Sequence, residues 1–125
     1  EFRSCMELTR RIYLPPVVAN FIARLVNATH PSESKASEGV KFGASPRAAL
    51  ALAAASRARA LLHQRQNASF EDIQAIARPV LQHRIILDYR ARVSGRSTAD
   101  VISAILSEVL PGGQEMPSTL LAAKV

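Results

Sequence analysis

At 125 residues, the chain is long enough for one domain with a single modest hydrophobic core. Sixteen lysines and arginines exceed ten acidic residues, and the net charge of +6 suits nucleic acid, an acidic partner or nucleotide phosphates without choosing among them. The single cysteine excludes an internal disulfide framework and a cysteine-rich metal site, and no apolar run approaches the roughly 20 residues of a membrane span.

The N-terminal residues lack the charged and then apolar pattern of a signal peptide, and one lone cysteine suits a reducing compartment, so we expect a cytoplasmic protein. Residues 1–9 are interpreted as linker residues or as residues left by cloning. Branched and aromatic side chains favour a short extended segment over residues 10–14, which two prolines end.

Residues 16–29 are predicted to form the first helix. Their apolar side chains recur at spacings of one, three and four, which places them in one stripe. Such a stripe favours a helix that faces the core over one that fills a partner's groove. Its members are Val17, Val18, Phe21, Ile22, Leu25 and Val26.

A polar loop over residues 30–43 follows, and loops of this length are often functional or disordered. Its end, Val40–Phe42, could form a short strand beside Ile12 or Ile85. The loop leads directly into the next helix, so it would lie near any anion bound there. Serine and lysine are equally common in ordinary flexible loops, and both interpretations remain open.

Three consecutive residues mark the start of the second helix. Ser45 is a preferred N-cap residue, whose hydroxyl is expected to accept a backbone hydrogen bond, and Pro46 suits the first helical position. Arg47 adds a cation where the helix dipole is already positive, so it is either a tolerated exposed side chain or part of an anion site. The alanine-rich helix is predicted to run over residues 46–66 and to let its neighbours approach closely.

Asn67 tolerates the left-handed conformation and is expected to close that helix. Ser69, with Asp72 three residues later, resembles a capping box, so a third helix should begin at once. Pro79 is predicted to interrupt it, which leaves residues 80–83 as a separate turn.

Residues 85–87 are short, branched and apolar, which favours a strand. Polar residues 88–95 are expected to connect this strand to a last amphipathic helix, which begins at Ser97 and ends before a Pro-Gly-Gly run. With residues 111–125 as a tail, the folded unit is expected over residues 10–110.

Several kinds of chemistry are missing from the sequence. It contains no glycine-rich phosphate loop followed by Lys and Ser or Thr, and no apolar run that ends in paired acids for Mg²⁺. The histidines, His30, His63 and His83, lack neighbours at ligand spacing, so no metal site is predicted. Ser45 has no identifiable His and Asp partners for a catalytic triad.

A family resemblance is carried by Gly43-Ala44-Ser45-Pro46-Arg47-Ala48, by Asn67-Ala68-Ser69-Phe70-Glu71-Asp72-Ile73 and by Val80-Leu81-Gln82-His83-Arg84-Ile85-Ile86-Leu87. In order and spacing these stretches resemble the C-terminal lid subdomain of MoxR-type AAA+ ATPases. The resemblance implies an all-α bundle of about four main helices with at most a minimal strand pairing. It also implies that Arg47 is the sensor 2 arginine, which points at the terminal phosphate, with Ser45 and Ala44 beside the nucleotide.

The resemblance further implies a larger protein. ATP and Mg²⁺ would be held by an upstream AAA+ nucleotide-binding core outside this chain, so these residues alone should not hydrolyse ATP. Proteins of this family look like chaperone-like machines that form homo-oligomeric rings, and their clients often contain von Willebrand factor A domains.

The alternative is a free-standing basic helical module that binds nucleic acid or a protein partner. The net charge of +6 supports it. However, the arginines are spread over several predicted helices, and there are few aromatic residues to stack on bases, so binding to nucleic acid is not favoured.

Overall fold

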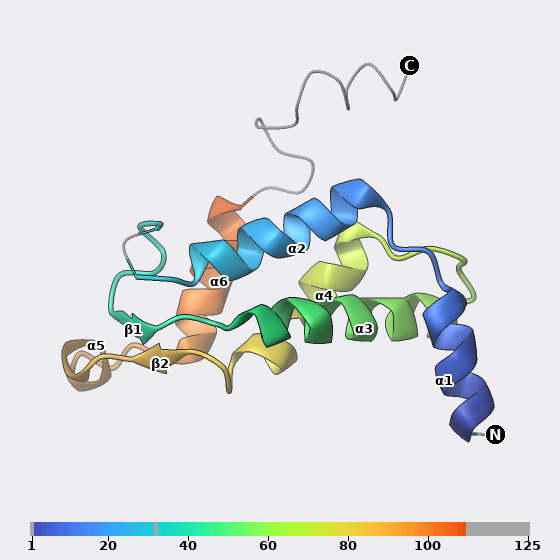
Figure 1. Cartoon of the computed structure of the whole chain (residues 1–125). Helices are drawn as coiled ribbons and strands as arrows, with labels where there is room; N and C mark the ends of the chain where they lie inside the picture. The colour runs from blue at the N-terminus through green and yellow to red at the C-terminus, as the bar shows by residue number, and fades with distance from the viewer. Residues whose placement is uncertain (1, 32, 110–125) are drawn as a thin grey trace, which may run out of the picture.

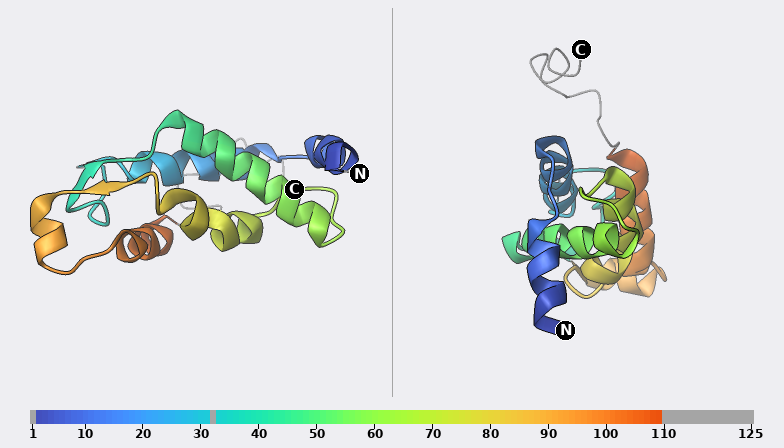
Figure 2. Two further views of the ribbon diagram at one scale, coloured as in Figure 1. Left: turned by 90° about the horizontal axis from the view of Figure 1, so that it is seen from below. Right: turned by 90° about the vertical axis from the view of Figure 1, so that its right-hand side faces the viewer.

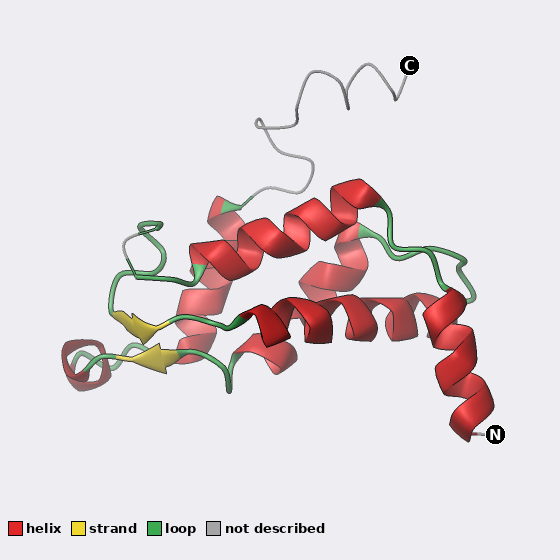
Figure 3. Cartoon of the chain, viewed as in Figure 1, coloured by secondary structure: helices red, strands yellow, loops and turns green. Residues whose placement is uncertain are grey.

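The computed structural model describes residues 2–31 and 33–109, which form a bundle of helices (Figures 1 and 3). The predicted all-α bundle with a minimal strand pairing is confirmed, while the predicted tail, residues 111–125, lies outside the described residues. The helices are α1 (Phe2–Arg11), α2 (Pro16–Ala28), α3 (Pro46–Leu62), α4 (Phe70–Leu81), α5 (Tyr89–Val93) and α6 (Thr98–Glu108). The strands are β1 (Val40–Phe42) and β2 (Ile86–Leu87).

Four helices enclose the core. α3 packs against α2 and α4, and α4 also contacts α2 and α6, which crosses the other helices (Figures 1 and 2). The buried face of α3 consists mostly of small residues four apart, so its neighbours can approach closely. The predicted stripe on α2 is buried apart from the half-buried Val17. The largest fully buried apolar side chains are Phe21, Leu25, Leu52, Ile73, Leu81, Ile102, Ile105 and Val101.

The sequence pattern does not predict α1, which continues through Arg11 and shortens the expected extended segment. What remains of that segment forms a single parallel bridge, in which the Tyr13 N–H donates to the Gln66 carbonyl and the Ala68 N–H donates to the Tyr13 carbonyl. The chain between α1 and α2 is therefore tied to the loop between α3 and α4.

The prediction that α3 reaches residue 66 and closes at Asn67 is wrong. The helix ends at Leu62, and Gln64 takes the left-handed conformation with φ 58°. The Gln64 N–H donates to the Leu61 carbonyl, and the Arg65 N–H donates to the Ala60 carbonyl, which is the Schellman pattern for closing a helix. This early turn brings Arg65 back toward the start of α4.

Helix α4 begins with the predicted capping box between Ser69 and Asp72. The predicted interruption at Pro79 is wrong, because the helix continues to Leu81. The missing proline N–H leaves the Ala75 carbonyl without its helical donor. Both Ala75 and Pro79 are exposed, so water can satisfy that carbonyl while the buried side of the helix stays intact.

The two strands form the only sheet that the described residues contain. They pair antiparallel, with Val40 opposite Leu87 and Phe42 opposite Ile86. The predicted strand over residues 85–87 is therefore confirmed for its last two residues, whereas Ile85 precedes the strand and Ile12 takes no part in the sheet. Helix α5 lies inside the segment that the sequence predicts to be a plain connection, and α6 begins with the predicted cap at Ser97.

Candidate functional site

The start of α3 holds the residues that the sequence singles out. Pro46 occupies the first helical turn and Ser45 the N-cap position, as predicted. The expected side-chain cap is wrong, because the Ser45 hydroxyl makes no capping bond. Its carbonyl instead accepts a hydrogen bond from the Ala48 N–H at 2.8 Å. The exposed hydroxyl is thus available to an outside group.

Arg47 lies in that first turn with an exposed side chain. Its guanidinium has no ion pair or hydrogen bond with any residue that the structure describes. No acidic residue lies in the first turn to offset it. An unpaired arginine beside the positive end of a 17-residue helix is an arrangement that attracts a phosphate or carboxylate.

Thr29, a residue that the sequence analysis does not single out, holds the backbone just before Arg47 in place. Thr29 is fully buried at the end of α2, where its hydroxyl donates to the Val26 carbonyl at 2.6 Å and accepts from the Ala44 N–H at 2.9 Å. Ala44 is itself fully buried, so its side chain lies in the core and not on the surface that Ser45 and Arg47 share. No local pattern identifies Thr29, because its partner lies 15 residues away.

Gly43 completes this junction. A Cβ added at Gly43 would lie 2.8 Å from the Thr29 carbonyl oxygen and 2.8 Å from the His30 Cα, which are backbone atoms that cannot turn aside. The chain therefore passes the end of α2 at a distance that only glycine permits. Glycine, alanine and threonine together fix the position from which Arg47 projects.

A second polar cluster lies at the opposite end of α3. The fully buried Asp72 accepts hydrogen bonds from Arg59 Nη1 at 2.7 Å and from Arg65 Nη1 and Nη2 at 2.8 and 2.5 Å. It also accepts the Ser69 N–H at 2.8 Å as part of the capping box. No local pattern in the sequence foresees that both arginines meet at Asp72, because Arg59 lies 13 residues before it.

Burial of Asp72 disfavours its charged form. The hydrogen bonds from Arg65, from the Ser69 N–H and from Arg59 outweigh that effect, and they hold the pKa of the carboxyl well below its usual range. The hydrogen bond to Asp72 in turn raises the pKa of Arg65. This saturated cluster has no free position for a ligand, and its effect is to join the end of α3 to the start of α4.

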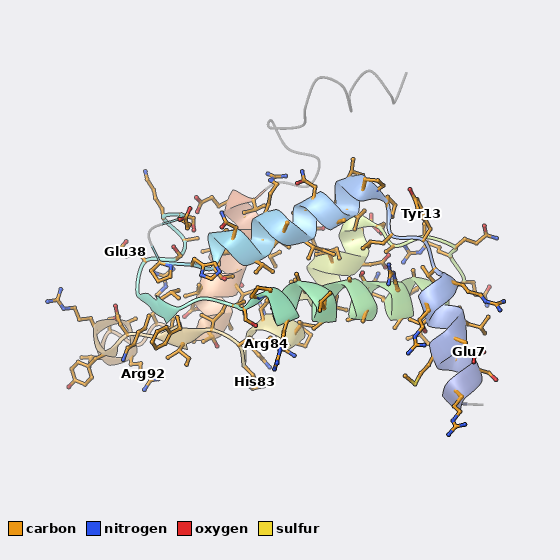
Figure 4. The ribbon with its side chains drawn as sticks, viewed as in Figure 1. Glu7, Tyr13, Glu38, His83, Arg84 and Arg92 are labelled. Atoms are coloured by element: carbon orange, nitrogen blue, oxygen red, sulfur yellow. The ribbon has the colours of Figure 1, made fainter. Side chains whose placement is uncertain are left out.

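Two hollows, of about 390 and 400 Å³, share Glu38 and Gly39 in their walls. Arg90 of α5 and Arg96, which follows that helix, also line the first hollow. Residues of the loop that begins at Pro31 line the second. Figure 4 shows Glu38 and Arg92 at this end of the molecule, far from Glu7 on α1. None of the predicted site residues, Ala44, Ser45 and Arg47, lines either hollow.

The described residues gather no group of three or more His, Cys, Asp or Glu side chains that could hold a metal ion. Within the same residues, every helix is too short or too polar to cross a membrane.

Comparisons with known proteins agree with this architecture. The family model of the AAA lid domain matches residues 32–105. The chaperone MoxR1 of Mycobacterium tuberculosis is 33% identical over 116 residues, which is 89% of this chain and 31% of MoxR1. The uncharacterized protein YeaC of Bacillus subtilis is 35% identical over 94 residues, which is 74% of this chain and 27% of YeaC.

Among solved structures, a proposed ATPase from Cytophaga hutchinsonii superposes with a TM-score of 0.79 and 34% identity, over 83% of this chain and 33% of that one. The chain spans about a third of the length of the relatives that it matches. The match over residues 32–105 includes the helix start at Arg47 and the junction at Asp72. The chain therefore belongs to the AAA lid domain family, and it is a lid subdomain of the MoxR type.

Proposed function

We propose that this lid closes over a nucleotide held by an AAA+ ATPase core and that Arg47 is the sensor 2 arginine, which donates to the terminal phosphate. The observation that carries the proposal is the unpaired, exposed guanidinium on the first turn of α3. Ser45 is exposed beside it and can add a hydroxyl to the same phosphate. Ala44 would contribute through its N–H bond to Thr29, which holds the helix start in place.

The chemistry requires a donor that is already in position. In phosphoryl transfer, negative charge is spread over the oxygens of the transferred group, and fixed positive groups stabilise it without reorganising. The hydrogen bond from Ala44 to Thr29 and the close approach at Gly43 support such a fixed position. ATP and Mg²⁺ would bind to a core in the remaining length of a longer protein, since the relatives are about three times as long as this chain.

The movement of the lid with the state of the nucleotide would couple hydrolysis to conformational change. The ion cluster at Asp72 supports this part of the proposal, because it makes α3 and α4 behave as one unit. One similar protein is named a chaperone, and we propose a chaperone-like role, in a homo-oligomeric ring, for the protein that carries this lid.

The test is Arg47→Ala in a full-length ATPase that carries this lid. We expect kcat for ATP hydrolysis to fall about a hundredfold, the effect of losing one directed donor to a transition state. Thermal stability should not change, because the side chain is exposed and unpaired. Arg47→Lys keeps the charge without the planar fork and should restore only part of the rate.

Arg10→Ala is the matched control, since it removes an exposed cation from α1 at the other end of α3. Its turnover should equal that of the unmodified protein. If the Arg47→Ala protein turned over ATP as fast as the unmodified protein, with the same dependence on nucleotide concentration, the sensor 2 assignment would be refuted.

A further inference from the structure

Helix α5 is only five residues long, yet it is closed at both ends. The Asp88 carboxylate accepts the Ala91 N–H at 2.8 Å at its start. At its end, Gly95 takes φ +85°, the Gly95 N–H donates to the Arg92 carbonyl and the Arg96 N–H donates to the Ala91 carbonyl. A helix this short does not hold itself together in water, so these caps are what order it.

The inner side of α5 is fixed to the loop before β1. A Cβ at Gly39 would lie 2.9 Å from the Ala91 Cβ, so the two backbones are in close contact. The Asp88 N–H donates to the Gly39 carbonyl at 2.8 Å. The Arg96 guanidinium donates to the Glu38 carbonyl at 2.7 Å and to the Ala36 carbonyl at 2.9 Å. The helix is therefore held in one orientation.

The outer side of α5 is apolar. Tyr89 and Val93 are four residues apart, and each lies two residues from the buried Ala91, so both point away from the bundle. Tyr89 is 81% exposed and Val93 is 68% exposed. Arg90 and Arg92 are each about 100° from Ala91 around the helix axis, on opposite sides, so they flank the apolar pair. We name these four residues, Tyr89, Arg90, Arg92 and Val93, the α5 ridge.

The ridge lies at the end of the molecule opposite α1 (Figures 1 and 2). Neither Arg90 nor Arg92 forms an ion pair with a described residue, although Glu38 and Asp88 line the hollow beside Arg90. The carboxylate of Asp88 is used by the helix cap. The strands at the same end add further exposed groups, namely Phe42, Ile86 and Lys41, whose Nζ lies 5.5 Å from the centre of the Phe42 ring.

We propose that the α5 ridge is a docking surface for an acidic polypeptide segment that places one apolar side chain between carboxylates. Tyr89 and Val93 would pack against the partner's apolar side chain, and Arg90 and Arg92 would pair with the carboxylates on either side of it. Tyr89 is the one ridge residue with a ring on which a base can stack, whereas proteins hold single-stranded nucleic acid on several such rings in succession, which favours a protein partner over nucleic acid. A second copy of this chain, with the same ridge and a net charge of +6, would bring like charges together.

The rigidity of α5 supports the same conclusion. A binding surface whose backbone is already ordered loses less conformational entropy when its partner arrives, so a small contact can reach useful affinity. Such a role accounts for a helix that is capped at both ends and still leaves Tyr89 and Val93 mostly exposed.

The proposal is tested by fluorescence anisotropy with the 125-residue chain and a labelled peptide in which a single Leu stands between runs of Asp and Glu. Tyr89→Ser should raise Kd at least about tenfold, as the loss of an aromatic anchor does. A double Arg90→Gln, Arg92→Gln variant should weaken binding and reduce its dependence on salt. Leu62→Ser, at an 82% exposed site on α3, is the matched control and should bind normally.

Far-UV circular dichroism and the melting temperature establish that each variant is folded. Absence of saturable binding, equal binding of a peptide with Gln in place of each acid, or equal weakening by Leu62→Ser would overturn the proposal. Tighter binding of duplex DNA to the same ridge would assign it to nucleic acid instead. Sedimentation that shows a dimer dispersed by Tyr89→Ser would identify the occupant as a second copy.

Discussion

Asp72 offers a sharp test of what joins α3 to α4. In the Asp72→Ala variant, the guanidinium groups of Arg59 and Arg65 lose their shared acceptor, and α4 loses half of its capping box. The loss of one partner from a buried ion pair costs about 3–5 kcal/mol. Both arginine side chains are about a third exposed and can regain water, with side-chain accessibilities of 31% and 36%. We therefore expect the lower end, about 3 kcal/mol, or roughly 10 °C in Tm.

The matched control is Asp100→Ala. Asp100 has the same place in the capping box of α6, where Ser97 is its partner, but it has no ion pair with an arginine in the described residues. Urea denaturation of both variants, at neutral pH and constant salt, separates the capping box from the ion cluster. The stability loss in Asp72→Ala should be clearly larger, and equal losses would show that the two arginines contribute nothing.

The pH dependence follows from the lowered pKa of Asp72, which Arg65, Ser69 and Arg59 produce against the effect of burial. The unfolded chain binds this proton near pH 4, well above the pH at which the folded chain does. The stabilisation by Asp72 is thus complete above pH 4 and is lost as the pH falls toward the folded pKa. The difference in unfolding free energy between the original chain and Asp72→Ala should shrink over that acidic range, and a constant difference would contradict the ion pair.

Three further substitutions test the assigned helix caps and the close approach at Gly43. Ser45→Ala should leave the urea midpoint unchanged because the hydroxyl makes no cap bond, whereas Ser69→Ala should lower stability by about 1 kcal/mol; similar losses in the two would contradict the assigned caps. Gly43→Ala should lower Tm by several degrees, since its Cβ would meet the backbone of Thr29 and His30, and unchanged thermal melting would refute that close approach.

Sequence reasoning succeeds here where the physical cause is local. The capping boxes at Ser69 and Ser97 depend on residues three apart, and the stripe on α2 depends on helical spacing. The start of α3 at Pro46 is likewise set by neighbouring residues. The exposed position of Arg47 agrees with the pattern, but its role as sensor 2 arginine stays a prediction.

The errors arise where distant residues decide. Gln64 rather than Asn67 takes the left-handed turn, and the closure there places Arg65 on Asp72, a contact across seven residues. Pro79 stays helical because its exposed side can be hydrated. Helix α5 needs its contact with Gly39, more than 45 residues earlier, which no local pattern reveals.

The bridge at Tyr13 determines how a mechanical pull would travel through the domain. Tension applied to the chain before Ile12 meets the two hydrogen bonds between Tyr13 and the loop at Gln66 and Ala68. It therefore reaches α3 near its C-terminal end, about 22 Å along the helix from Arg47. Because Thr29 and Gly43 hold the opposite end of α3, that end is the pivot, and a strain from the bridge would shift the C-terminal end of the helix further than it shifts Arg47.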